Sequence, residues 1–328
     1  MANYTEVTEF IILGFSDLPE MQLLLFLVFL VIYLIAMMGN FLIIFAVCFD
    51  PHLHSPMFFF LMNLSFLEIC YVTITVPKLL AMLITQYKII PFTECIIQMY
   101  LFLSCTDTEF YLLTAMAYDR YVAICNPLRY IIIMNWKVCI ALVSVAWITG
   151  FLDPVPHLIF TTKSSFCYSN KINHFFCDIT ALMTLSCSDT YLIEIANYIE
   201  GLLLAFTPFL LMITSYVFII SSILRIHSAE GRRKTFSTCS SHLTVVLLFY
   251  GISIGVYMRP KSSYSMDVNK LLNVVYITAI PLLNPLIYSL RNKELKGALL
   301  KATRRVEPYF SFKINNTQLL AFVTASQQ

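Results

Sequence analysis

The sequence is poor in charge and in the residues that interrupt apolar stretches. Only 12% of its 328 residues are charged, whereas 59% are hydrophobic. A soluble domain carries about 25% charged residues, so this composition excludes an ordinary soluble globular protein. The 8 glycines and 13 prolines are too few for a collagen-like or low-complexity chain. The apolar excess must therefore face lipid.

Further features that the sequence lacks argue against several functional classes. The net charge of +2 and the lack of a basic stripe argue against nucleic-acid binding. No Lys or Arg precedes the first apolar run, so we expect that run to be an uncleaved signal anchor rather than a cleavable signal peptide. No H-E-x-x-H or G-x-S-x-G string occurs, which disfavours an intramembrane hydrolase. The lack of repeated halves disfavours a transporter or channel, although acids within apolar segments would suit an ion path.

Seven segments are long and apolar enough to cross a bilayer as helices, which takes about 20 residues. They are Met21–Phe49, Met57–Leu83, Ile96–Tyr118, Val138–Leu152 (extended to about His157 if Asp153 lies at the interface), Gly201–Leu224, Leu243–Met258 (extended back to Thr235) and Leu271–Leu290. Glu68, Asp107 and Glu109 fall within these segments. Because an acid at membrane depth is costly, we expect all three to face the interior. The sequence predicts an all-α membrane protein, a seven-transmembrane helix bundle.

The basic residues set the orientation. With the N-terminus outside, 14 of the 21 basic residues lie in inner segments and 7 in outer ones, as the positive-inside rule requires. We therefore expect a multi-pass protein of the plasma membrane. Its predicted parts are an extracellular N-terminus at 1–22, a transmembrane domain at 23–291, and a cytoplasmic tail at 292–328 with an amphipathic helix at about 292–304. The sequon at Asn3 is a predicted glycosylation site.

Five short motifs stand in order along these segments. They are LHSPMF at Leu53–Phe58, MAYDRYVAIC at Met116–Cys125, KTFSTCSSHL at Lys234–Leu243, PLLNPLIY at Pro281–Tyr288 and SLRN at Ser289–Asn292. With these motifs, the chain resembles the odorant (olfactory) receptors of the tetrapod type, which are rhodopsin-like G-protein-coupled receptors, from about Gly39 to Ala298. The resemblance implies a receptor that is not an enzyme. It would bind a small odorant and activate a stimulatory, olfactory-type heterotrimeric G protein, raising cyclic AMP.

A cytoplasmic switch is predicted at the ends of the third and seventh segments. Arg120 at the inner membrane face is poorly solvated, and Asp119 offers it a charge-assisted partner, whose release would let Arg120 reach Tyr216 and Tyr288. Pro285 removes a backbone hydrogen bond and favours a bend. A plain interfacial anchor, or for 234–242 a solvated helix end, is the alternative interpretation. The predicted switch residues are Asp119, Arg120, Tyr121, Tyr216, His242, Asn284, Pro285 and Tyr288.

A buried polar cluster is implied by the resemblance. Related receptors hold water and sodium where this chain has Asn40, Glu68, Glu109 and Asn284. The family usually has Asp where this chain has Glu68, and the extra methylene changes the geometry. The alternative is a pair of protonated carboxyl groups, since burial disfavours the charged form. We expect no other cofactor or metal.

Four cysteines fall in predicted outer loops, where disulfides form. Cys95, Cys167, Cys177 and Cys187 allow three pairings. The resemblance implies Cys95–Cys177 and Cys167–Cys187. A zinc site with His174 is the alternative.

The ligand is expected in the outer half of the bundle. Steps of three and four residues give one face of the third segment, and the resemblance adds positions on later segments. The predicted pocket residues are Met99, Phe102, Leu103, Thr106, Asp107, Phe110, Glu200, Leu204, Tyr250, Ser253, Ile254, Tyr257 and Val274. An ionised Asp107 and Glu200 would favour a basic ligand, whereas protonated ones would only hydrogen-bond to Thr106, Ser253 or water. A non-olfactory amine receptor would place its acid at Leu103 or Phe102, and neither is acidic.

Overall fold

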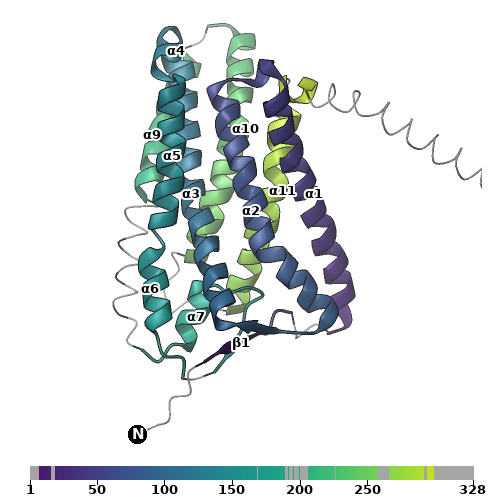
Figure 1. Cartoon of the computed structure of the whole chain (residues 1–328). Helices are drawn as coiled ribbons and strands as arrows, with labels where there is room; N and C mark the ends of the chain where they lie inside the picture. Colours follow the sequence, from purple (N-terminus) through teal and green to yellow (C-terminus); the bar gives the residue numbers. More distant parts are fainter. Residues whose placement is uncertain are drawn as a thin grey trace, which may run out of the picture.

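The computed structural model describes residues 7–15, 19–167, 169–188, 191, 195, 199, 206–225, 227–257, 266–291 and 294–298, some of those in α10 and α11 by their backbone alone. This part of the chain is mainly helical (Figure 1). Its helices and strands are β1 (Glu9–Ile12), α1 (Gln22–Phe49), α2 (Pro56–Thr85), β2 (Ile89–Pro91), α3 (Phe92–Cys125), α4 (Tyr130–Ile133), α5 (Trp136–Leu152), α6 (Val155–Lys163), β3 (Lys171–Ile172), α7 (Ile179–Leu185), α9 (Thr207–Leu224), α10 (Ala229–Tyr257) and α11 (Met266–Arg291).

The long helices form one bundle around α3. Helix α3 contacts α2, α5, α9 and α10, while α1 packs against α2 and α11. Figure 1 shows α1, α2, α3, α5, α9, α10 and α11 side by side along one direction. A predicted transmembrane segment overlaps each of these seven helices.

Five helical segments of the described chain are long and apolar enough to cross a membrane. They are Pro19–Phe49, Pro56–Thr85, Trp136–Lys163, Thr207–Leu224 and Lys270–Ile287. Helix α3 falls short because it carries polar residues, but those residues, such as Gln98, Ser104 and Glu109, are buried in the bundle. Apolar side chains instead cover the outside: Leu23 and Phe49 of α1 are both 70% exposed, while Asn40 of the same helix is 1% exposed. This inverted arrangement suits a protein whose solvent is lipid.

Two glycines allow helices to approach closely. A Cβ at Gly150 of α5 would lie 2.1 Å from Oγ1 of Thr108 and 2.7 Å from its backbone nitrogen. A Cβ at Gly39 of α1 would lie 3.0 Å from Cβ of Pro285 in α11. Small residues at such crossings let membrane helices pack backbone to backbone. The central helix and the proline-containing α11 are held in place by these contacts.

The fourth predicted segment is broken in two. Helix α5 ends at Leu152 and α6 begins at Val155, with Pro154 at the junction. Proline has no N–H to continue the hydrogen-bond ladder, and it is tolerated where a new helix starts. Asp153, which we placed at the membrane interface, accepts a hydrogen bond of 3.1 Å from the hydroxyl of Tyr111 in α3.

A small three-stranded sheet, which the prediction of an all-α bundle did not include, closes the end of the bundle at which α7 lies. Strand β1 is its centre, antiparallel to β2 with Phe10 opposite Ile90, and parallel to β3 with Ile12 opposite Ile172. All four of these side chains are buried. Strands of two to four residues are too short for an alternating pattern, and their partners are far apart in the sequence. Sequence periodicity therefore gave no signal for them.

The opposite end carries α4 and the start of the tail (Figure 1). Residues 294–298 are helical, with Leu295 and Ala298 buried and Glu294 and Lys296 exposed. This two-sided pattern agrees with the first part of the predicted amphipathic helix. Residues 292–293 and 299–304 of that prediction lie outside the described residues.

Candidate functional site

The loop after α6 (residues 164–167 and 169–188, called the lid below) is fastened over the end of α3 that carries Cys95. Cys177 is bonded to Cys95 at the start of α3, and Cys167 is bonded to Cys187, with Cα–Cα distances of 5.4 and 5.7 Å. This is the pairing that the family resemblance implies. Because these cysteines are oxidised, they cannot be the thiolate ligands of the alternative zinc site. The side chain of Gln98 adds a polar link, accepting from the Cys177 N–H at 3.0 Å and donating to the Ile74 carbonyl at 2.8 Å.

The same loop is tied to α11 and to the N-terminal segment. The ammonium group of Lys270 donates to the Gly14 carbonyl at 2.8 Å and to the Asn173 side chain at 2.9 Å. His174 stacks on Phe175 with ring centroids 4.5 Å apart, and its Nε2 lies 3.3 Å from the amide nitrogen of Asn273. Burial, helped by the charge of Lys270, lowers the pKa of His174 to about 3. The imidazole is therefore neutral at physiological pH and belongs to the apolar underside of this lid.

The predicted ligand-binding face of α3 points into the bundle. Met99, Phe102, Thr106 and Phe110 are buried, while Leu103 and Asp107 are half-buried. From α10, Tyr250 and Ser253 are buried, and Val274 of α11 is half-buried. Glu200 and Leu204 lie outside the described residues, as do the side chains of Ile254 and Tyr257. The described side chains that were predicted for the pocket on α10 and α11 are thus buried or half-buried.

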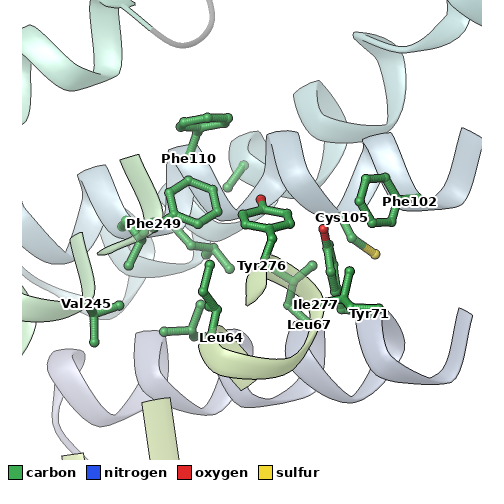
Figure 2. Close-up of a cluster of buried hydrophobic side chains, with 14 of the residues drawn as sticks. Leu64, Leu67, Tyr71, Phe102, Cys105, Phe110, Val245, Phe249, Tyr276 and Ile277 are labelled. Atoms are coloured by element: carbon green, nitrogen blue, oxygen red, sulfur yellow. The ribbon is translucent and has the colours of Figure 1, made fainter. Parts of the chain in front are cut away.

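An aromatic cluster fills the space beneath the lid. Tyr276 of α11 lies at its centre in Figure 2, with its ring centroid 5.6 Å from Tyr71 and 5.8 Å from Phe249. Phe102 contacts Phe176 of the lid at 4.5 Å, and Phe110 contacts Phe249 at 4.7 Å. These contacts form a continuous path of rings from the lid to the middle of α10.

Sequence reasoning missed four members of this cluster, namely Tyr71, Phe176, Phe249 and Tyr276. A signal for Tyr276 was present. Counting back from Asn284 in steps of three and four reaches Ile280, Ile277, Tyr276 and Asn273, and all of these are buried. The family resemblance instead assigned Val274 to the pocket. The spacing of three and four residues would by itself have identified the side of α11 that faces the bundle interior.

The predicted polar cluster lies deeper in the bundle. Asn40, Glu68, Glu109 and Asn284 come from α1, α2, α3 and α11, and each is at most 3% exposed. The Asn284 amide donates to the Glu68 carboxyl, which lies close enough to Glu109 for the two acids to interact electrostatically. Asn40 donates to the Pro281 carbonyl at 3.1 Å and so ties α1 to α11. In the part of the chain that the structure describes, no three His, Cys, Asp or Glu side chains are placed to hold a metal ion.

The residues of the predicted cytoplasmic switch include an ion pair between Asp119 and Arg120. Arg120 donates from Nη2 to Oδ2 of Asp119 at 2.5 Å and from Nε at 3.0 Å. The Tyr130 hydroxyl of α4 donates to the other carboxylate oxygen at 2.7 Å. Burial and the Asp119 charge raise the pKa of Tyr130, so its hydroxyl stays a proton donor. Asp119 therefore has a donor on each oxygen, and its side chain is fully buried.

A second polar contact joins α9 to α10. The Tyr216 hydroxyl lies 2.6 Å from Nδ1 of His242, and their rings are stacked. Both residues were predicted for the switch, but not their contact with each other. Tyr121 packs against Phe218 of α9 at 5.9 Å rather than joining either polar contact. The side chain of Tyr288 and the predicted sugar site Asn3 lie outside the described residues.

Exposed apolar residues surround this switch, and sequence reasoning missed them as well. Leu128 is 98% exposed, and Ile131 and Ile132 are 84% and 74% exposed. They lie between α3 and α5, next to Tyr130, which reaches Asp119. The run PLRYIII after the MAYDRYVAIC motif was a signal, because apolar residues in a loop outside the membrane call for a partner.

Comparison with known proteins decides the family. A family profile described as "Olfactory receptor" matches residues 29–305. The chain is 48% identical to mouse "Olfactory receptor 5AR1" over 299 residues, covering 91% of this chain and 96% of that protein. It is 46% identical to human "Olfactory receptor 5I1" and 47% identical to human "Olfactory receptor 1F1", covering 92% and 93% of this chain and 96% and 97% of those proteins. The chain belongs to the olfactory receptor family.

Membership of this family identifies the class of protein and its fold. Olfactory receptors are G-protein-coupled receptors that detect odorants, and they are not enzymes. It is a multi-pass membrane protein, and its family fold is the seven-transmembrane bundle. The lid and the aromatic cluster lie towards one end of this olfactory receptor, and the Asp119–Arg120 pair lies at the other.

Proposed function

We propose that this olfactory receptor binds a small volatile odorant in the outer half of its bundle and activates a stimulatory, olfactory-type G protein, which raises cyclic AMP. The observation that carries the proposal is the buried Asp119–Arg120 pair at the opposite end of α3 from the disulfide-held lid. One helix thereby connects the aromatic cluster to the switch. An odorant can shift the balance of open and closed states only by its different affinity for the two.

The proposed topology has seven crossings, with α3 and α10 added to the five apolar segments. Both helices keep polar side chains inside the bundle, as Glu109 and His242 illustrate, so their lower hydropathy does not expose polar groups to lipid. Strand β1 lies in the sheet at the end that contains both disulfides. Disulfides form in the secretory lumen, which supports an extracellular N-terminus and a plasma-membrane location.

Asn3 provides the test of this topology. We expect the receptor to carry a sugar that a glycosidase removes, and Asn3→Gln to abolish that mobility shift. Labelling of an N-terminal tag by an impermeant reagent added to intact cells should be complete. Labelling only after the plasma membrane is opened would contradict the orientation.

We propose that the odorant contacts the aromatic cluster and the inward face of α3. Rings supply a large apolar surface, and Thr106 and Ser253 supply hydrogen-bonding groups, which is the usual makeup of a small-molecule site. A ligand there would lie between the lid residue Phe176 and the α10 residues Phe249 and Tyr250. Moving those α10 side chains would displace the inner end of the same helix.

On the cytoplasmic side we propose that the G protein covers Leu128 and its apolar neighbours. A nearly fully exposed leucine next to the Tyr130–Asp119 contact would link partner binding to the ion pair. Leu128→Ala should weaken coupling by about tenfold, as burying one such side chain contributes about 1.5–3 kcal/mol. Cyclic AMP and surface receptor would be measured together, with the half-buried neighbour Ile133→Ala as the matched variant.

We further propose that a sodium ion binds among Asn40, Glu68, Glu109 and Asn284. Oδ1 of Asn40 and Oε1 of Glu109 are buried and have no hydrogen-bond partner among the described residues, and hard cations take oxygen ligands. The purified receptor should unfold at a higher temperature in sodium chloride than in choline chloride. Glu109→Gln should remove that difference, and a difference that survives the substitution would place the ion elsewhere.

Arg120→Ala is the main test of the receptor proposal. A panel of chemically diverse volatiles would first identify an agonist through cyclic AMP. The variant should lose the agonist response while keeping surface expression, because the arginine is needed for the open state. Lys137→Ala removes an exposed charge from the same end and should respond normally. An unchanged response in Arg120→Ala, or agonist-driven ion flux without cyclic AMP, would overturn the proposal.

A further inference from the structure

A groove lies between the inner ends of α9 and α10. It has a volume of about 350 Å³ and is lined mainly by Ile220, Ile223, Leu224 and Phe236, together with Arg232 and Arg233. Ile223 is buried, whereas Leu224 and Phe236 are more than half exposed. The groove therefore opens to the outside of the bundle, and its size falls within the about 300–1,000 Å³ that is usual for ligand sites.

Arg232 and Arg233 add positive charge to this otherwise apolar groove. Both are exposed, and neither forms an ion pair with a carboxylate of the described residues. Glu230, the nearest acid in sequence, does not line the groove. Two neighbouring arginines bind phosphate well because each planar guanidinium group can donate two parallel hydrogen bonds to phosphate oxygens. A soluble anion would use the arginines but leave the apolar walls uncovered.

We propose that this groove binds an anionic phospholipid of the inner leaflet. The headgroup phosphate would lie on Arg232 and Arg233, and an acyl chain would cover Leu224 and Phe236. Helix α9 ends at Leu224, so the two arginines follow the membrane segment at the depth of the lipid headgroups. The inference rests on the proposed orientation, in which these helix ends are cytoplasmic.

The opposite face of the same helices argues against a G-protein segment as the occupant. A segment that reaches Arg120 must approach from the side of Tyr216 and His242, which are both buried inside the bundle. The groove residues Ile220, Leu224 and Phe236 are exposed on the outer side. Lipid, which surrounds that side, fits both its charge and its apolar surface.

Fluorescence quenching tests the proposal without any signalling readout, so its outcome is independent of the receptor's activity. Phe236→Trp places a reporter in the groove of the full-length receptor in phosphatidylcholine nanodiscs. Brominated phosphatidylserine or brominated phosphatidylcholine is added at the same low fraction, and quenching of Trp136 and Trp147 is subtracted using the receptor without the reporter. We expect on the order of tenfold enrichment of the anionic lipid, since each basic residue near the surface contributes measurably to such binding.

Control variants and a competitor distinguish binding of the anionic phospholipid in the groove from general electrostatic attraction to a basic surface. Arg232→Gln/Arg233→Gln should reduce quenching by phosphatidylserine to the level of phosphatidylcholine, whereas Arg129→Gln/Lys137→Gln removes the same charge from the same end and should not. Glycerophosphoserine, which has the headgroup without acyl chains, should not compete. Equal quenching by both lipids, equal loss in both double variants, or full competition by the headgroup would each overturn the proposal. Native mass spectrometry of the receptor without the reporter checks lipid retention if Phe236→Trp fails to fold.

Discussion

The two ends of the bundle are closed by different kinds of contact. At one end, two disulfides and a three-stranded sheet fix the lid, and Lys270 ties it to the N-terminal segment. At the opposite end, side-chain contacts join neighbouring helices, among them those of Tyr130 with Asp119 and of Tyr216 with His242. A covalent bond holds while the receptor signals, whereas a hydrogen bond contributes only about 0.5–1.5 kcal/mol. The end that carries the Asp119–Arg120 pair is therefore held by weaker contacts than the end that carries the lid.

Removing the lid disulfide should have the largest effect. Cys95→Ser/Cys177→Ser loses a constraint worth about 2–5 kcal/mol, so we expect little receptor at the cell surface. Surface staining against total receptor measures this. Cys48→Ser removes a free, exposed cysteine and should express normally. Normal surface levels in the double variant would mean that the sheet and Lys270 hold the lid without the bond.

At the inner end, Tyr130→Phe should activate the receptor rather than unfold it. It removes one donor from the Asp119 carboxylate, at a cost of about 1.5 kcal/mol for a hydrogen bond to a charged group. That corresponds to roughly a tenfold shift towards the open state. Basal cyclic AMP should rise at equal surface expression, while Tyr118→Phe on α3, next to Asp119 in the sequence, should leave it unchanged. A lower basal level would mean that Tyr130 supports the open state instead.

Acid should loosen the outer end through His174. Its pKa is lowered to about 3 in the closed lid, so the open lid binds more protons between about pH 3 and its ordinary pKa of 6.5. The contribution of the neutral His174 to the stability of the closed lid is therefore complete above pH 6.5 and falls as the pH drops below that value. At pH 5.5, the free energy that keeps the lid closed should be lower by about 1 kcal/mol. Hydrogen exchange of residues 169–188 at pH 7.5 and 5.5 measures the loss. His174→Phe should remove the pH dependence, and a wild-type lid that exchanges equally at both pH values would contradict it.

The smallest effect is expected for Asp107→Asn and Glu200→Gln. A protonated carboxyl that only hydrogen-bonds should change odorant potency by about fivefold or less, in line with about 0.5–1 kcal/mol, and equally for neutral and basic odorants. Dose–response curves for matched alcohols and amines measure this. A loss confined to the amines would show that an ionised carboxylate selects basic ligands.

The transmembrane helices were predictable because bilayer thickness fixes their length. The residues at which these helices begin and end were harder to predict. Helix α3 extends from Phe92 to Cys125, beyond the predicted Ile96–Tyr118, because its polar residues face neighbouring helices and hydropathy does not mark its ends. The spacing of Met99, Phe102, Thr106 and Phe110 gave the inward face of α3 directly.

Contacts between distant segments could not be predicted. The Tyr216–His242 hydrogen bond joins residues from two helices whose rotation about their axes no local pattern specifies. The same holds for Lys270, whose sequence neighbours indicate only a charge near a helix start, yet whose partner is the carbonyl of Gly14. Such pairs depend on how the whole bundle assembles.

The central position of β1 has a consequence for how the receptor is made. The ribosome produces Glu9–Ile12 long before its partners at Ile89–Pro91 and Lys171–Ile172. The leading segment therefore stays unpaired until α2 has been made, and the three-stranded sheet is complete only after α6. Epitope tags placed ahead of residue 7 should be harmless, whereas trimming beyond Thr8 should leave the receptor trapped by quality control.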